Sequence, residues 1–89
     1  GLVDWRMSSN SINNLVRALN DPYPLASFVY KNKEYKLKKV KIVKCKLKLE
    51  PGKIISVKNN KPVIKTGDNA IQLLDFKPLT SFKEEEYIL

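Results

Sequence analysis

Lysine alternates with apolar residues along residues 35–49. Of all the features of the sequence, this pattern constrains the fold most strongly. A period of two is typical of a β-strand with one buried face. The phase changes, however, at Lys38-Lys39 and again at Ile42-Val43. Because a regular strand would turn half of the apolar side chains to solvent, we expect a β-bulge at each position. A long, bulged and bent strand is what a small closed barrel needs.

Shorter runs of β-forming residues surround this strand, each bounded by residues that favour turns. The further strands are expected at residues 25–31, 53–58, 62–65 and 70–76. The turns are expected at Asn32-Lys33, Pro51-Gly52, Asn59-Asn60 and Gly67-Asp68-Asn69. Such a series predicts an antiparallel, mainly β fold.

An amphipathic helix precedes the strands. Its apolar residues recur every three or four positions and therefore share one face; they are Ile12, Leu15, Val16 and Leu19. Ser8, Ser9 or Asn10 can cap its start, and Pro22 ends it. Arg17 is expected on the polar side, roughly 150° from the apolar stripe.

The elements together predict one small domain that is mainly β. We expect a five-stranded, OB-like Greek-key barrel preceded by one α-helix. Ser81 stands three residues before Glu84, the spacing of a capping box, which predicts a short C-terminal helix. We divide the chain into a linker and helix at residues 1–21, the barrel at 22–78 and a tail at 79–89.

The positive charge of the chain is concentrated in one segment. The net charge is +8, and residues 31–49 contain nine lysines and a single acid, Glu34. Such a stripe favours a polyanion partner, although a lysine-rich composition would also give a merely solvated face. If the apolar residues fill the barrel, the candidate nucleic-acid-binding lysines line its outside: Lys36, Lys38, Lys39, Lys41, Lys44, Lys46 and Lys48.

The composition excludes several kinds of chemistry. The chain has no histidine, the commonest general base and metal ligand, so we expect no catalytic residue and no metal site. A single cysteine, Cys45, excludes an internal disulfide and is expected to be a small core residue. The single cysteine also favours a reducing, cytoplasmic setting. No apolar run approaches the roughly 20 residues that span a bilayer, so we expect no membrane partner.

Three smaller features have a structural interpretation. Trp5 and Tyr23 could stack on bases, but we expect both to pack on the barrel. The glutamates at positions 84–86 are expected to be solvated charges at the start of the C-terminal helix.

Four segments resemble, in order and spacing, the C-terminal domain of the 10-formyltetrahydrofolate-dependent formyltransferases. They read INNLVRALNDPYP, FVYKNKEYKL, EPGKIISV and TGDNAIQLLDF, and the resemblance covers residues 3–77. Its anchors are Trp5, Arg17-Ala18, Pro22-Tyr23-Pro24, Pro51-Gly52 and Gly67-Asp68. The resemblance implies an N-terminal catalytic domain, which would carry the catalytic Asn, His and Asp of the family and would bind 10-formyltetrahydrofolate. This chain would then be non-catalytic, with no cofactor of its own, and Arg17 would contact the catalytic domain.

The resemblance leaves three functions open. In the methionyl-tRNA formyltransferase branch, this domain would hold tRNA through the lysines, for translation initiation. The spacing in RALNDPYP is instead similar to the nucleotide-sugar branch, where the domain would be mainly structural. The sequence DFKPLTSFKEEE also lacks the Gln and Gly-Lys cluster that is usual at this position in the tRNA branch. A free-standing nucleic-acid-binding barrel is the third. An exposed apolar patch on the helix would imply a missing domain. A helix face buried on its own barrel would allow a free-standing nucleic-acid-binding barrel.

Overall fold

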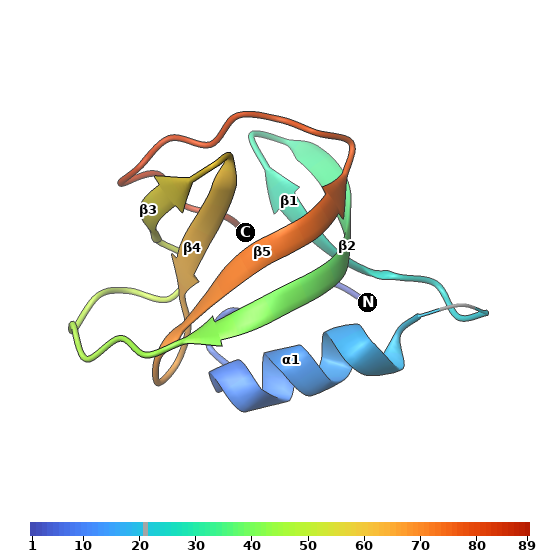
Figure 1. The fold of residues 1–89 in the computed structure, drawn as a ribbon, viewed down its shortest axis with the longest axis horizontal. Coiled ribbons are helices and arrows are strands. Elements are labelled where there is room, and N and C mark those ends of the chain that lie inside the picture. Colours follow the sequence, from blue (N-terminus) through green and yellow to red (C-terminus); the bar gives the residue numbers. More distant parts are fainter. Residues whose placement is uncertain (21) are drawn as a thin grey trace.

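A computed structural model describes residues 1–20 and 22–89, and the predicted boundary at residue 21 lies outside them. One helix precedes five antiparallel strands that form a single sheet in the order β1-β2-β5-β4-β3 (Figure 1). The elements are α1 (Ser9–Ala18), β1 (Ala26–Tyr30), β2 (Lys33–Val43), β3 (Ile54–Lys58), β4 (Lys61–Lys65) and β5 (Ala70–Lys77). The predicted fold class is confirmed.

The strand order is a Greek key. Strands β3, β4 and β5 are joined by short turns and are neighbours in the sheet, whereas β2 lies beside β5. Residues 44–53 carry the chain from the end of β2 across to β3 (Figure 1). This is the arrangement in which a long connection returns a fourth strand to the side of the first.

Strand β2 contains the first of the two predicted bulges. Its register against β5 shifts between Leu37 and Lys39 and again between Lys39 and Val40. The extra residue changes which side chains face inward, so Tyr35, Leu37 and Val40 are all buried although their spacing is irregular.

The second predicted bulge is wrong. Ile42 pairs with Ile71 and Val43 with Ala70 in unbroken register. Ile42 is accordingly not turned into the core, and 37% of its surface stays exposed.

Strand β2 also ends earlier than predicted, at Val43 rather than at residue 49. Ala70, which pairs with Val43, is the first residue of β5, so no neighbouring backbone continues the ladder beyond this point. The next segment is held by a side chain instead, because the backbone N–H of Cys45 donates to Oδ1 of Asn69 at 3.1 Å. Cys45 is half-buried rather than a core residue.

The turn between β1 and β2 lies one residue before the predicted position. Lys31 and Asn32 both adopt positive φ, of 50° and 64°, and Lys33 is the first residue of β2. Two central residues of positive φ match the right-handed twist of the flanking strands. The predicted Asn59-Asn60 turn is confirmed and has the same form, with φ of 52° and 62°.

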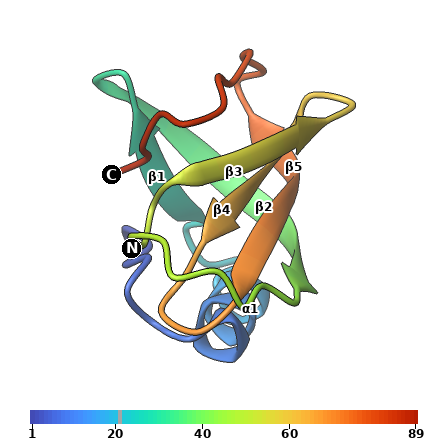
Figure 2. The same ribbon diagram turned by 90° about the vertical axis from the view of Figure 1, so that its left-hand side faces the viewer.

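The C-terminal tail forms no helix, and that prediction is wrong. It runs instead between the two edge strands of the sheet (Figure 2). The backbones of Val29 in β1 and Leu89 exchange hydrogen bonds of 2.9 and 3.1 Å, while the N–H of Ile54 in β3 donates to Glu86 O at 2.8 Å. Pairing the two open edges and burying apolar side chains of the tail stabilise the chain more than one short, marginal helix would.

Side chains also fix the tail to the barrel. Phe82 and Ile88 are buried. The hydroxyl of Tyr30 donates to the carboxylate of Glu86, and Lys53 Nζ pairs with Glu85 at 2.8 Å. These two glutamates therefore hold the tail against the sheet and are not the helix-start charges that we expected.

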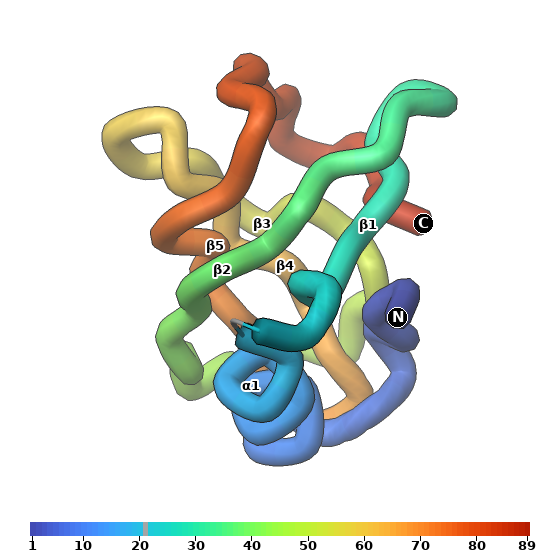
Figure 3. The backbone as a smooth tube through the Cα atoms, turned by 90° about the vertical axis from the view of Figure 1, so that its right-hand side faces the viewer, coloured from blue at the N-terminus to red at the C-terminus, as the bar shows by residue number. Residues whose placement is uncertain are grey.

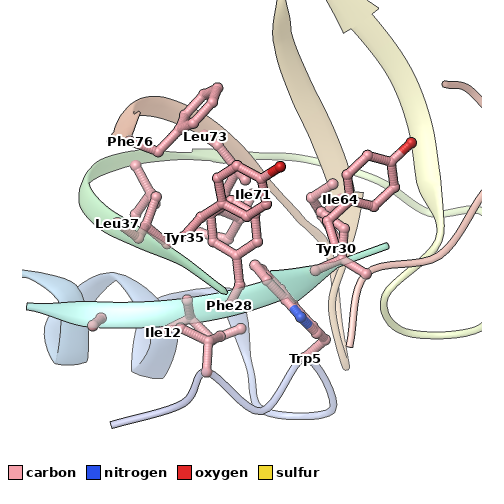
Figure 4. Packing of buried hydrophobic residues seen from close by; sticks show 14 of the residues in the cluster. Trp5, Ile12, Phe28, Tyr30, Tyr35, Leu37, Ile64, Ile71, Leu73 and Phe76 are labelled. Atoms are coloured by element: carbon pink, nitrogen blue, oxygen red, sulfur yellow. The ribbon is translucent and has the colours of Figure 1, made fainter. Parts of the chain in front are cut away.

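The core is built around Phe28 on β1 (Figure 4). Its ring stacks on Tyr35 at a centroid distance of 5.2 Å and meets Phe76 edge-on at 6.1 Å. Trp5 approaches the same ring at 6.5 Å and is buried, which confirms its predicted packing role. The prediction for Tyr23 is wrong, since 63% of this side chain is exposed.

Helix α1 packs on its own barrel. Ser8 is the N-cap, as one of the predicted alternatives, and its hydroxyl accepts a hydrogen bond from the N–H of Ser11. Ile12 and Val16 are fully buried. The helix ends at Ala18, four residues before Pro22. Leu15 and Leu19, the other residues of the predicted apolar face, are half-buried, and no large apolar side chain of the helix is fully exposed. The helix therefore supplies no exposed patch that would by itself imply a missing domain.

Candidate nucleic-acid interface

The seven candidate lysines are all exposed but belong to two different segments. Four of them extend from β2, namely Lys36, Lys38, Lys39 and Lys41, and three lie in the following connection, namely Lys44, Lys46 and Lys48. The prediction of one continuous strand is therefore wrong, because β2 has no partner beyond Val43.

A groove lies between α1 and β2. Figure 3 shows the backbones of these two elements, with α1 below the sheet and β2 crossing above the helix. The volume of the groove is about 460 Å³. We call it the α1–β2 groove, and it is lined by Asn13, Val16, Arg17, Asn20, Lys38, Lys39, Val40 and Asp75. It brings together Arg17 and two of the candidate lysines, although the first of them is 21 positions after Arg17 in the sequence.

The bulge in β2 explains why two consecutive lysines line one groove. Successive side chains of a regular strand point to opposite faces. At Lys38 and Lys39 the register against β5 is interrupted, and both side chains are exposed. The same irregularity that keeps Val40 buried thus gives the groove two cations instead of one.

Positive charge dominates the groove. Arg17, Lys38 and Lys39 face one carboxylate, Asp75, which pairs with Lys39 in the strand register. Within residues 1–20 and 22–89, none of the three cations takes part in an ion pair of 4.0 Å or less. Lys36 differs from them, because its Nζ lies 2.9 Å from Glu34.

A polar network fixes the start of α1 to the turn between β4 and β5. The hydroxyl of buried Ser9 lies 2.7 Å from Thr66 Oγ1 and donates to Ala70 O at 3.0 Å. The backbone N–H of Ser9 donates to Asp68 Oδ1 at 2.9 Å. That hydrogen bond, followed by weaker ones from Thr66 and the turn backbone, lowers the pKa of Asp68 below its ordinary value of 3.8.

The sequence predicted Gly67-Asp68 as a turn but not this docking role. The N–H of Gly67 donates to Met7 O at 2.9 Å, so the turn also holds the segment that precedes α1. The groove depends on this contact, because the turn sets where the helix lies along the sheet.

The described part of the chain has neither a metal-binding cluster nor a membrane-spanning helix. No group of three or more His, Cys, Asp or Glu there is placed to hold a metal ion. No helix among the same residues has the length and apolar character needed to cross a membrane.

Comparison with known proteins gives a consistent result. Residues 1–83 match the sequence model of the family described as formyl transferase, C-terminal domain. The chain is 37% identical to a methionyl-tRNA formyltransferase of Clostridium beijerinckii over 97% of this chain and 28% of that relative. It is 42% identical to that of Staphylococcus epidermidis, over 85% of this chain and 24% of the relative. The chain therefore spans about a quarter of the length of these relatives.

Proposed function

This chain belongs to the formyl transferase C-terminal domain family, and on that premise we propose that it is the tRNA-binding domain of a methionyl-tRNA formyltransferase-like enzyme. The similarity to methionyl-tRNA formyltransferases supports the tRNA branch over the nucleotide-sugar branch. In this proposal the domain holds the tRNA, and an N-terminal catalytic domain of the same chain transfers the formyl group.

The observation that carries the proposal is the exposed lysine surface on β2 and the connection that follows it. Lysines contact phosphate oxygens as flexible point charges and release counterions when they bind. Such contacts position a nucleic acid but read little of its sequence. They fit a domain whose role is to hold one large substrate while another domain acts on its end.

The formyl donor, 10-formyltetrahydrofolate, fits the α1–β2 groove poorly. The α1–β2 groove is lined by polar, charged and valine side chains, with no aromatic ring on which a pterin could stack. We therefore assign donor binding and catalysis to the N-terminal domain of the parent enzyme. The residues of this chain bind and orient the substrate.

A titration with tRNA at several salt concentrations tests the proposal. We expect log K to fall with log salt at about −0.9 per phosphate contact, with a slope that implies about four or more contacts. Lys44→Glu with Lys46→Glu should weaken binding strongly and make the slope shallower. The matched control is Lys58→Glu with Lys61→Glu, which changes the charge equally at the β3–β4 turn, at the other end of the sheet from α1 (Figure 1).

Two results would contradict the proposal. One is the absence of tRNA binding at 50 mM salt, which would leave the nucleotide-sugar branch as the better reading. The other is an equal loss of affinity in the two double variants, because binding would then follow net charge and not this surface.

A further inference from the structure

The α1–β2 groove combines two amide side chains with three cations that form no ion pair within residues 1–20 and 22–89. Asn13 and Arg17 are one helical turn apart on α1 and both line the groove, with Asn20 shortly after the helix. Lys38 and Lys39 lie on the opposite wall, at the bulge of β2. A guanidinium presents its donors as a planar fork that matches two oxygens of one phosphate.

The floor of the groove suits the sugar that accompanies a phosphate. Val16 and Val40 line it, and only 1% and 8% of their surfaces remain exposed. Its volume of about 460 Å³ lies within the range of small-ligand sites, roughly 300–1,000 Å³. A phosphate with its ribose can therefore fit between the helix and the strand, above the two buried valines.

Both walls of the groove are fixed before any ligand binds. The helix is held by its buried apolar face and by the hydrogen bond from Ser9 to Asp68. The lysines extend from β2, which pairs with β5 before and after the bulge, at Leu37 and at Val40. A site on rigid elements loses little freedom when it binds.

From these observations we infer that the α1–β2 groove binds a phosphodiester of the RNA backbone, with Arg17 as its central contact. This inference rests on the proposed function and deepens it, since it locates one contact point of the tRNA. It also gives Arg17 a role different from the contact with the catalytic domain that the sequence suggested. The lysines at positions 44–48 would contact further phosphates along the same strand of RNA.

Paired isosteric variants of the helix test the inference. Asn13→Asp places a carboxylate in the groove, whereas Asn14→Asp makes the same chemical change at the next residue, which is exposed and outside the groove. Both variants have the same net charge and nearly the same position along the helix. We expect Asn13→Asp to reduce tRNA affinity at least about fivefold more than Asn14→Asp, because it repels a phosphate that the control does not approach.

Variants of Arg17 test the contact itself. A charged hydrogen bond of about 1.5–3 kcal/mol corresponds to roughly a tenfold loss of affinity or more in Arg17→Ala. The salt slope should become shallower by about one contact. Arg17→Lys should recover the slope but only part of the affinity, since an ammonium cannot form the two-oxygen fork. Circular dichroism would establish that each variant is folded.

A site-resolved titration separates this inference from the proposed function. We would add a tetranucleotide of adenylate to the labelled protein and follow the side-chain amide signals of Asn13 and Asn20 and the Arg17 Nε–H by NMR. Shifts at these groups support the groove. Shifts confined to residues 44–50 would overturn the groove while leaving the tRNA proposal intact. No shifts at all, with no binding of tRNA, would overturn both.

Discussion

The carboxylate of Asp68 accepts a hydrogen bond of 2.9 Å from the backbone N–H of Ser9, 59 residues earlier in the chain. The first N–H groups of a helix have no partner within the helix. The hydroxyl of Ser8 accepts a hydrogen bond from the N–H of Ser11. Asp68, in the distant turn between β4 and β5, accepts one from the N–H of Ser9. The position of α1 on the sheet, and with it the shape of the α1–β2 groove, therefore depends on a contact between the start of the helix and the distant turn between β4 and β5.

We predict that Asp68→Asn lowers stability at neutral pH and that this difference disappears in acid. Its hydrogen bonds lower the pKa of Asp68 in the folded state below 3.8. The stabilisation is therefore fully present above the unfolded-state pKa and is lost as the pH falls through the folded-state pKa. Urea unfolding of the unchanged protein and of Asp68→Asn between pH 7 and pH 2 measures this difference in stability. Glu84→Gln removes an exposed carboxylate elsewhere and serves as control. A difference that stayed constant with pH would refute the electrostatic explanation.

Gly67→Ala should be strongly destabilising. A Cβ at this position would lie 2.2 Å from the carbonyl oxygen of Arg6 and 3.1 Å from that of Met7, so the backbone must move. Overpacking of this kind costs on the order of 1–3 kcal/mol. Gly1→Ala is the control, because its Cβ would meet nothing within 4 Å. Equal urea midpoints for the two variants would show that the turn and the N-terminal segment do not approach so closely.

A buried side chain of the C-terminal tail should contribute much more to stability than an exposed one, because the tail packs on the sheet. Ile88→Ala should lower the free energy of unfolding by about 2–5 kcal/mol, since this side chain is 2% exposed and its loss leaves a cavity. Leu79→Ala, in the same tail but 80% exposed, should change it by less than about 0.5 kcal/mol. Urea denaturation of both variants measures the difference. If the tail were loosely attached, the two substitutions would have similar small effects.

Asp75→Asn should increase the affinity for tRNA. Asp75 is the one carboxylate among the residues that line the α1–β2 groove, and it repels a phosphate there. An exposed charge interaction of roughly 0.2–1 kcal/mol corresponds to an increase of up to about fivefold. Glu84→Gln makes the same change of net charge in the tail. We would compare the tRNA affinities of the two variants at one salt concentration. Equal gains in affinity would mean that the groove does not contact the RNA.

The sequence determined the local elements of this fold. The spacing of Ile12 and Val16 predicted the helix and its buried face, and the alternation in β2 predicted the bulge at Lys38-Lys39. The Asn59-Asn60 turn followed from two residues that tolerate positive φ. Each of these depends on neighbours within a few positions, which a sequence pattern contains.

Only the tertiary structure decided where those elements end and what they meet. Strand β2 stops at Val43 because its partner β5 begins opposite it, and the period of two continues past that point without a partner. The tail pairs with β1 and β3 instead of forming the helix that its capping-box spacing favoured. The groove likewise joins Arg17 to Lys38 and Lys39 through packing of α1 on the sheet. Hydrogen bonds and burial between distant segments fixed these features, and no local pattern encodes which segment will supply the partner.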